Sequence, residues 1–430
     1  MLPSLRHPVR IASRNDVTKE KVTLQLSKVS NKLAKAIHHT TTNSLPQEAI
    51  DGLLGALLKS DKCTPRQLQS EADQKFDQLR QRKMPAPPEE VREARAEKLF
   101  RRYKWRPLAF KTREQCAAYA LATLPMHYAE AKFAFDELDR FDFKPESILD
   151  YGSGAGGAFW AAHKKWGNVL KDYSMVDPNT PINHFAMDVM RTYDLVIAQR
   201  VLSEIDSEES RMDLFRLLWE RTDKYLVFIE ANLEDHFKAV MQIRDYLITM
   251  GTKFDKKEQK AYMSANKLLD DDDARNILID KQASQLEKYN FLKHSNIRVP
   301  TEIERGYVVA PCPHDTGCPM YAGRDKYEEV CSHIVKYKEI RADGRNKSYE
   351  KSGMLRSIFT YLILAKGSRP VGRPLSRILR KTHTTNCEHC RLCTPFEGLQ
   401  RFSLSKRAGL SYEKLKLANE GCLFPLEVTF

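Results

Sequence analysis

Hydrophobic positions along the chain form short continuous runs that alternate with helical spacings. The apolar run before Asp150 predicts a buried strand, and apolar residues at helical spacing predict helices over 158–166 and around 214–219. Three further runs predict strands, at 173–177, 193–198 and 224–230. Strands that alternate with helices in this way indicate a parallel sheet covered by helices on both faces.

Upstream of this sheet the apolar spacing is helical. Residues 19–59 are predicted to be largely helical, prolines near residue 85 interrupt the pattern, and a helix over 112–141 leads into the first strand. Later, strands at 305–310 and 357–365 are apolar and β-branched. They would form an antiparallel hairpin at the end of the sheet.

A glycine-rich turn follows the first predicted strand, where Gly152, Gly154 and Gly156 are spaced G-x-G-x-G. Glycine lets a backbone turn sharply and approach a ligand, and the following helix N-terminus attracts negative charge. Asp150 stands two residues before the first glycine, which is typical of Rossmann-type proteins that bind S-adenosylmethionine. The next strand ends in Asp177, expected to meet the ribose hydroxyls of such a cofactor. The alternative is a tight strand-to-helix turn without a ligand.

The chain is 430 residues long, enough for two or three domains, and basic, with 70 Lys and Arg against 57 Asp and Glu. A net charge of +13 favours an acidic partner such as nucleic acid. No apolar run approaches the roughly 20 residues of a membrane span, so no membrane partner is expected. The densest basic stretch has no acid, and its cations are the predicted contacts to RNA phosphates, a solvated surface being the alternative. They are Arg369, Arg373, Arg377, Arg380 and Lys381.

The first residues carry Arg6, Arg10 and Arg14, with no acid before Asp16 and with apolar residues between them. This composition is typical of a mitochondrial transit peptide, which we predict over residues 1–18. An ordinary basic tail is the alternative.

Six of the nine cysteines lie between Cys312 and Cys393, and with no secretory signal a disulfide framework is not expected. They are Cys312, Cys318, Cys331, Cys387, Cys390 and Cys393. The last three could supply a zinc knuckle, whereas Cys312 and Cys318 are too far apart in sequence for one. The spacing favours a [4Fe–4S] cluster held by four thiolates, with zinc and unliganded cysteines left open.

Several motifs together resemble the methyltransferase-like assembly factors of the mitochondrial small ribosomal subunit. The similarity covers most of the chain from about Thr112, and Pro-Cys-Pro-His at 311–314 is its most specific part. The other motifs are Leu-Pro-Met-His-Tyr-Ala at 124–129, the loop at 150–160, Ser203-Glu204, Cys318-Pro319 and His-Cys-Arg-Leu-Cys-Thr-Pro at 389–395.

The resemblance implies a [4Fe–4S] cluster whose four ligands, carried over by motif, are Cys312, Cys318, Cys331 and Cys393. It also implies binding to the rRNA and proteins of the small ribosomal subunit in the mitochondrial matrix, in support of mitochondrial translation. Off the ribosome the protein is expected to be a monomer.

The sequence departs from a full methyltransferase in two places. Between Asp177 and Asp194 too few residues remain for a helix, a strand and a second helix, so one strand is expected to be shortened or lost. Nucleic-acid amino methyltransferases place Asp/Asn-Pro-Pro-aromatic after the fourth strand, where this chain has Ala-Gln-Arg-Val at 198–201. No general base is evident, so no catalytic residue is assigned.

We therefore predict an α/β fold, a Rossmann-like class I methyltransferase sheet with an N-terminal helical region and a small C-terminal β appendage carrying the metal cluster. The expected boundaries are 19–143 for the helical region, 144–365 for the methyltransferase-like domain with an insertion at 251–298, and 366–430 for the basic C-terminal region. The interpretation is an rRNA-binding assembly factor, with S-adenosylmethionine as a further candidate cofactor. The alternatives are an active S-adenosylmethionine-dependent rRNA methyltransferase and a zinc-stapled RNA-binding protein.

Overall fold

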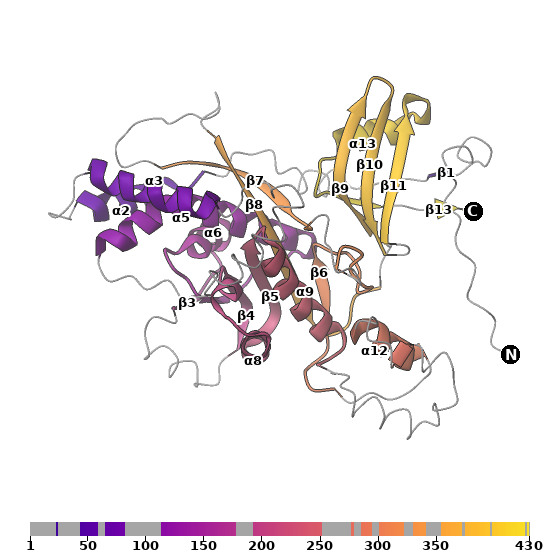
Figure 1. Ribbon diagram of the computed structural model, residues 1–430, viewed down its shortest axis with the longest axis horizontal. Helices are drawn as coiled ribbons and strands as arrows, with labels where there is room; N and C mark the ends of the chain where they lie inside the picture. Colours follow the sequence, from indigo (N-terminus) through magenta and orange to yellow (C-terminus); the bar gives the residue numbers. More distant parts are fainter. Residues whose placement is uncertain are drawn as a thin grey trace, which may run out of the picture.

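Seven strands form the mixed sheet at the centre of the computed structural model (Figure 1). They are β2 (Ser147–Tyr151), β3 (Asp172–Val176), β4 (Tyr193–Gln199), β5 (Thr222–Ala231), β6 (Gly306–Ala310), β7 (His333–Lys338) and β8 (Met354–Lys366). The order is β3-β2-β4-β5-β8-β6, and β7 also pairs with β8. The structure describes residues 23–24, 44–58, 65–81, 113–177, 192–251, 277–278, 285–294, 301–321, 330–340, 354–371, 375–395, 398–425 and 428–429.

The sheet changes direction at β8. Strands β3, β2, β4 and β5 are parallel, whereas β8 runs antiparallel to β5, β6 and β7. The central strands are buried on both faces, which explains why their sequences are continuous apolar runs rather than alternating ones. Every strand predicted from those runs is present, including the antiparallel pair of β6 and β8.

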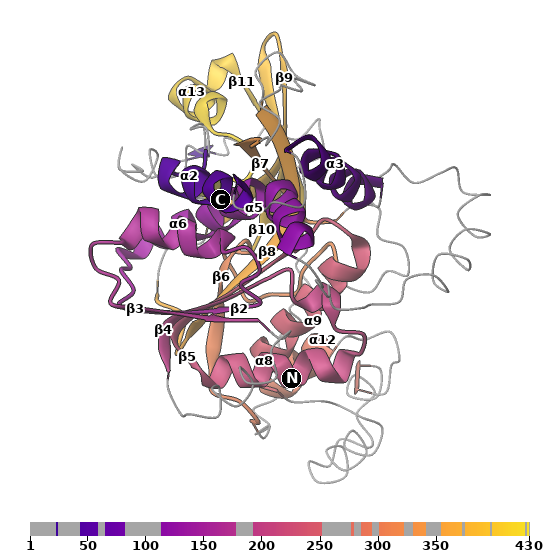
Figure 2. The same ribbon diagram turned by 90° about the vertical axis from the view of Figure 1, so that its left-hand side faces the viewer.

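Helices cover both faces of the sheet, as Figure 2 shows. They are α5 (Arg113–Asp136), α6 (Gly157–Trp166), α8 (Glu208–Glu220) and α9 (Glu234–Ile248). Alternate residues of one strand enter different cores: Leu195 of β4 packs with α5 and α6, whereas Val196 packs with α8 and α9. The result is a three-layer α/β arrangement, as predicted.

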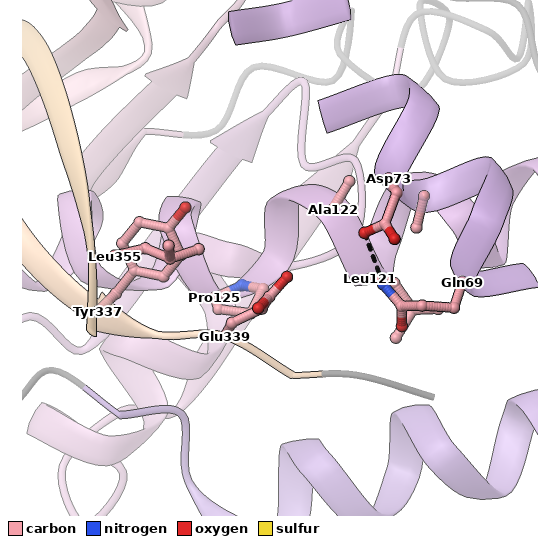
Figure 3. Close-up of a pocket in the computed structure, with 9 residues that line it drawn as sticks. Gln69, Asp73, Leu121, Ala122, Pro125, Tyr337, Glu339 and Leu355 are labelled. Atoms are coloured by element: carbon pink, nitrogen blue, oxygen red, sulfur yellow. Dashed lines mark hydrogen bonds between the residues drawn. The ribbon is translucent and has the colours of Figure 1, made fainter. Parts of the chain in front are cut away.

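The N-terminal helices belong to the same core as the sheet. Helices α2 (Gln47–Leu58) and α3 (Pro65–Gln81) pack against α5, and their buried Ala49 and Leu68 join the core under α5 and α6. Figure 3 shows a small pocket between α3, α5 and the β7–β8 edge, beside which Gln69 Nε2 donates to Asp73 Oδ1 at 3.2 Å. A boundary at residue 143 therefore runs through one continuous core.

The C-terminal region forms a second, antiparallel sheet. Its strands are β9 (Leu375–Thr384), β10 (Cys387–Thr394), β11 (Gly398–Ser405) and β12 (Leu423–Pro425), in the order β11-β10-β9-β12. Helix α13 (Leu410–Leu417) covers one face over a core that includes Ile378, Leu404 and Leu415. This is the small β appendage that the sequence predicts, drawn in yellow in Figure 1.

Some predictions fall on residues that the structure does not describe. The transit peptide at 1–18, the expected loss of a strand between Asp177 and Asp194, and Arg373 lie wholly or largely there. Of the insertion at 251–298, the described part includes helix α12 (Gln285–His294). Among the described residues, no helix is long and apolar enough to cross a membrane.

Candidate functional site

Four cysteines from three segments of the chain meet where the C-terminal sheet adjoins the central one. Cys312 and Cys318 follow β6, Cys331 precedes β7, and Cys393 lies near the end of β10. The Cys312 and Cys318 thiols hydrogen-bond to each other, and the charge of Cys312 acts on both Cys331 and Cys393. Cys312, Cys318 and Cys393 are buried and Cys331 is half-buried. The structure thus brings together the four cysteines for which the resemblance implies a role as ligands.

The thiols differ in pKa because their surroundings differ. The hydrogen bond from Cys318 lowers the pKa of Cys312 to about 6, and the guanidinium groups of Arg244 and Arg377 act in the same direction. Burial raises the pKa of Cys331 to about 12 and also raises that of Cys393. A site with one thiolate and neutral neighbours must release protons when it binds a soft metal.

A fully buried arginine supports the site from α9. Arg244 donates through Nη2 to the carbonyl oxygens of His314 at 3.3 Å and Thr316 at 2.5 Å, and through Nη1 to Asp245 at 2.9 Å. These bonds hold the turn between Cys312 and Cys318. The sequence signal for this residue was available, because Arg244 stands on the apolar face of an amphipathic helix.

Two arginines hold the same turn from the C-terminal side. Arg377 of β9, whose side chain is 1% exposed, donates to the Pro311 carbonyl oxygen and pairs with Glu137 at 2.8 Å. Arg369 donates to Asp315 at 2.7 and 2.8 Å and to the Pro313 carbonyl oxygen at 3.2 Å. Residues 311–316 are therefore fixed between the two sheets.

His314 links this turn directly to β10. Its Nε2 lies 3.4 Å from the sulfur of Cys393, and its Nδ1 lies 2.7 Å from Thr316 Oγ1. Burial lowers the pKa of His314 to about 4, so the ring is neutral at physiological pH. A neutral ring can donate one hydrogen bond to a thiolate sulfur without adding charge.

The other two clustered cysteines stay apart from the site. Cys390 points to the opposite face of β10 and packs in the core with Ile378 and Leu404. Cys387 begins the strand, six residues before Cys393. In a regular strand Cys390 and Cys393 face opposite ways, so the zinc knuckle considered for this segment does not form. Among the described residues, no group of three or more His, Cys, Asp or Glu side chains could hold a single metal ion.

The glycine-rich loop is bonded within the protein. Gly152 adopts φ +74°, and a Cβ there would lie 2.4 Å from Val201 Cγ2. The amide groups of Gly152 and Ser153 both donate to the Val176 carbonyl oxygen, at 2.6 and 3.2 Å. Gly156 also has positive φ, at +80°, where the loop enters α6. Packing and backbone conformation alone therefore account for glycine at 152.

The two acids predicted for the cofactor lie beside this loop. Asp150 is 1% exposed and accepts from Tyr173 Oη at 2.9 Å. Burial raises its pKa to about 7, opposed by the Tyr173 hydrogen bond, and the charge of Asp177 raises it further. Gly154, at φ +48°, faces Tyr119 at ordinary contact distance. The structure thus brings together the five residues predicted to bind S-adenosylmethionine.

An internal ion pair occupies the position where amino methyltransferases carry their acceptor motif. Arg200 adopts φ +65° and its NH2 pairs with Glu130 of α5 at 2.5 Å. Glu130 is fully buried and also accepts from Gln199 Nε2 at 3.1 Å and from Ser357 Oγ. Sequence analysis singled out the departure at 198–201 but not Glu130, which comes from a distant helix.

The predicted RNA-contacting cations have different environments. Arg369 and Arg377 hold the 311–316 turn, and Lys381 Nζ donates to three carbonyl oxygens at the end of α13, at 2.7 to 2.8 Å. Arg377 is not accessible to RNA in this structure. Arg380 is exposed, and Arg373 lies outside the described residues. The run is therefore largely structural rather than one continuous basic surface.

The chain is similar in sequence to known mitochondrial proteins. The chain is 24% identical over 358 residues to the human ribosome assembly protein METTL17, mitochondrial, across 75% of this chain and 65% of that protein. It is 21% identical over 306 residues to Rsm22-cox11 tandem protein 2, mitochondrial, of Schizosaccharomyces pombe, across 63% of this chain and 34% of that one. The chain thus spans less than two thirds of either relative.

A solved structure, the plantazolicin methyltransferase BpumL with a monoazolic desmethylPZN analog and SAH, is 14% identical, with a TM-score of 0.27 over 69% of this chain and 99% of that one. A family model, described as mitochondrial small ribosomal subunit Rsm22, matches residues 113–193, 184–265 and 287–425. Because these segments include both sheets and all four converging cysteines, the chain belongs to the Rsm22 family.

Proposed function

We propose that this protein acts in assembly of the small ribosomal subunit in the mitochondrial matrix, supporting mitochondrial translation. It would bind rRNA and subunit proteins through a methyltransferase-like scaffold, as a monomer off the ribosome. Membership of the Rsm22 family and similarity to a human mitochondrial ribosome assembly protein support the role. The basic charge of +13 suits an RNA partner.

We further propose that Cys312, Cys318, Cys331 and Cys393 hold a [4Fe–4S] cluster. The observation that carries this is the convergence of four thiols from separate segments at one buried place, with Cys387 and Cys390 excluded. Thiolates are the ligands such clusters require. When bound, such a group adds its binding free energy to the stability of the fold.

The scaffold is proposed to have no catalytic role. Arg200 and Glu130 form a buried ion pair at the position of the missing acceptor motif, and the backbone of the glycine-rich loop bonds to Val176. S-adenosylmethionine is the second candidate ligand, because Asp150 and Asp177 lie beside the loop as its binding would require. An active rRNA methyltransferase is the corresponding second function.

The experiment compares Cys393→Ser with Cys387→Ser in the full chain. Cys393→Ser should remove iron, abolish absorbance in the visible region, lower the melting temperature and reduce co-sedimentation with the small subunit. Cys387→Ser should leave all four unchanged, because its side chain lies outside the converging set. Loss of iron in Cys387→Ser, with iron retained in Cys331→Ser, would overturn the ligand set.

Cofactor binding is tested separately by titrating the purified protein with S-adenosylmethionine in a calorimeter. No binding supports a scaffold without methyl transfer. Binding together with methylation of small-subunit rRNA would replace the non-catalytic proposal by the methyltransferase one.

A further inference from the structure

Three arginines lie side by side across the C-terminal sheet. Arg391 of β10 is directly opposite Arg380 of β9 on one side and Arg401 of β11 on the other. Directly opposed residues of antiparallel strands share a face and stand close together. The three side chains therefore form one row across three adjacent strands, which we call the arginine row.

A register shift creates the row. On β9, Arg377 pairs with Cys393 and Ile378 pairs with Leu392, but the next pair is Arg380 with Arg391. Leu379 is left over as the extra residue of a bulge. Without this shift Arg391 would face Leu379, and Arg380 would point to the other side of the sheet. Bulges are a common device for aiming a side chain near a functional site.

From the row outward, the described residues on this face of β9, β10 and β11 are polar and include no acid. The next two rows outward are Thr382, His389 and Ser403, then Thr384, Cys387 and Ser405. His389 Nδ1 lies 2.7 Å from Ser403 Oγ, and its Nε2 lies 3.3 Å from Thr384 Oγ1. The acidic Glu388 belongs to the opposite face, where it meets His383 and Lys381.

The row has a cost that a ligand would remove. Like charges directly opposite each other destabilise a sheet, and here two such pairs are adjacent. Arg380 and Arg401 are exposed, and within the described part of the chain neither forms an ion pair with a carboxylate. An anion with regularly repeated charges would neutralise several guanidinium groups at once.

We propose that the arginine row, with the hydroxyl groups beyond it, binds the phosphate backbone of single-stranded or loop RNA. Guanidinium groups bind phosphate bidentately, and hydroxyl groups reach phosphate and ribose oxygens. A protein partner would need apolar anchors, which none of these nine side chains supplies. The choice of RNA rests on the proposed function in ribosome assembly.

The row is coupled to the cysteine centre through β10. Arg391 precedes Cys393 by two residues on the same strand face, so the group that fixes Cys393 also fixes the strand that presents Arg391. On β9, Arg377 is buried beside Cys393, at the end of the strand near the cysteine centre. Arg380 lies further along the same face, in the row, and is exposed. This placement explains how a buried centre can govern an RNA contact that it does not touch.

The test measures fluorescence anisotropy of a labelled single-stranded RNA, taken from the small-subunit rRNA, with the full-length protein at several salt concentrations. Arg391→Gln/Arg401→Gln should weaken binding about tenfold at low salt. It should also reduce the slope of log Kd against log salt by about 1.4, because two phosphate contacts are lost. Arg391→Lys/Arg401→Lys should keep most of the slope and lose part of the affinity.

The matched control is Lys164→Gln/Lys238→Gln, which removes two exposed cations from α6 and α9 and changes net charge equally. It should leave affinity within about twofold if a localised surface binds the RNA. Equal effects in the two double variants would overturn the proposal. The proposal would also be overturned if the Arg391→Gln/Arg401→Gln variant bound RNA normally but no longer bound an acidic protein of the small subunit.

Co-sedimentation of the wild-type protein with the small subunit distinguishes failure of the proposed assembly role from failure of the proposed arginine row. If it co-sediments and the row variant still binds RNA normally, the arginine row is wrong and the assembly role stands. If it does not co-sediment but the row variant alone loses RNA binding, the assembly role is wrong and the row stands. Absence of RNA binding by the wild type would overturn the row.

Discussion

The glycine-rich loop and the four-cysteine centre are both built on sequence motifs, but their groups are used differently. In the loop, Gly152 is required by the close approach of Val201, and its amide bonds to Val176. In the cysteine centre, thiols from separate segments converge around a turn held by buried arginines, and their pKa values are pulled apart. The loop is explained by the protein alone, whereas the four thiols come from three segments of the chain and gather at one place.

The difference shows how to weigh a motif. A motif contiguous in sequence can persist because a tight turn needs it, so its presence says little about a ligand. Convergence of reactive side chains from distant segments costs chain entropy and burial of polar groups. It is therefore the stronger indication of function, and variants in the two regions should differ accordingly.

The largest expected effect is at the support of the cysteine centre. Arg377→Met should lower the free energy of unfolding by about 3–5 kcal/mol, because it leaves the buried carboxylate of Glu137 without its partner. Chemical denaturation of the purified protein measures this. Adding Glu137→Gln should recover part of the loss by removing the orphaned charge.

Arg380→Met is the matched control, since Arg380 lies three residues further along β9 with its side chain exposed. Arg380→Met should change the free energy of unfolding by no more than about 0.5 kcal/mol. Similar costs at the two positions would mean that Arg377 does not have the special supporting role that its burial indicates.

The second effect tests whether the glycine-rich loop is a packed turn in which Gly152 is required by contact with Val201. Gly152→Ala should cost about 1–3 kcal/mol, because its methyl group would overlap Val201. On a Val201→Ala background the added cost should fall to about 1 kcal/mol, the residual strain of positive φ. Thermal and urea unfolding of the four proteins give the coupling between the two positions.

Gly154→Ala separates packing from ligand binding. Gly154 shares the positive φ, but a Cβ there meets Tyr119 only at 3.7 Å. Gly154→Ala should therefore lower the free energy of unfolding only by the backbone strain of positive φ, on the order of 1 kcal/mol. If Gly154→Ala costs as much as Gly152→Ala, contact with Val201 is not what requires glycine at 152.

The last effect concerns the pH dependence of the loop. Burial raises the pKa of Asp150 to about 7 from 3.8, so between these values the native protein retains a proton that the unfolded chain has lost. The unfolding free energy of the wild type should therefore fall relative to Asp150→Asn as pH rises from about 4 to 7, by at most about 1.4 kcal/mol per pH unit. Parallel pH profiles for the two proteins would show that Asp150 ionises normally.

The sequence by itself determined the layered core and the location of the chemistry. Continuous apolar runs predicted β2 to β5 because strands buried on both faces have no polar side, and β6 and β8 were found in the same way. The density of cysteines after residue 311 predicted a metal centre, and the resemblance implied four ligands; both stay predictions, but the structure does bring these four cysteines together. Apolar runs, motifs and the number of cysteines can all be read along the sequence, so these predictions require no knowledge of tertiary contacts.

Only the tertiary structure decided which charged residues face inward. Arg369, Arg377 and Arg380 are equivalent in the sequence, yet Arg377 is buried against Glu137 and Arg380 is exposed. The bulge at Leu379 that turns Arg380 toward Arg391 has no sequence signature, because a register shift is defined only by the partner strand. Likewise Glu130 and Arg200 are 70 positions apart, and their pairing depends on how α5 packs across the end of β4.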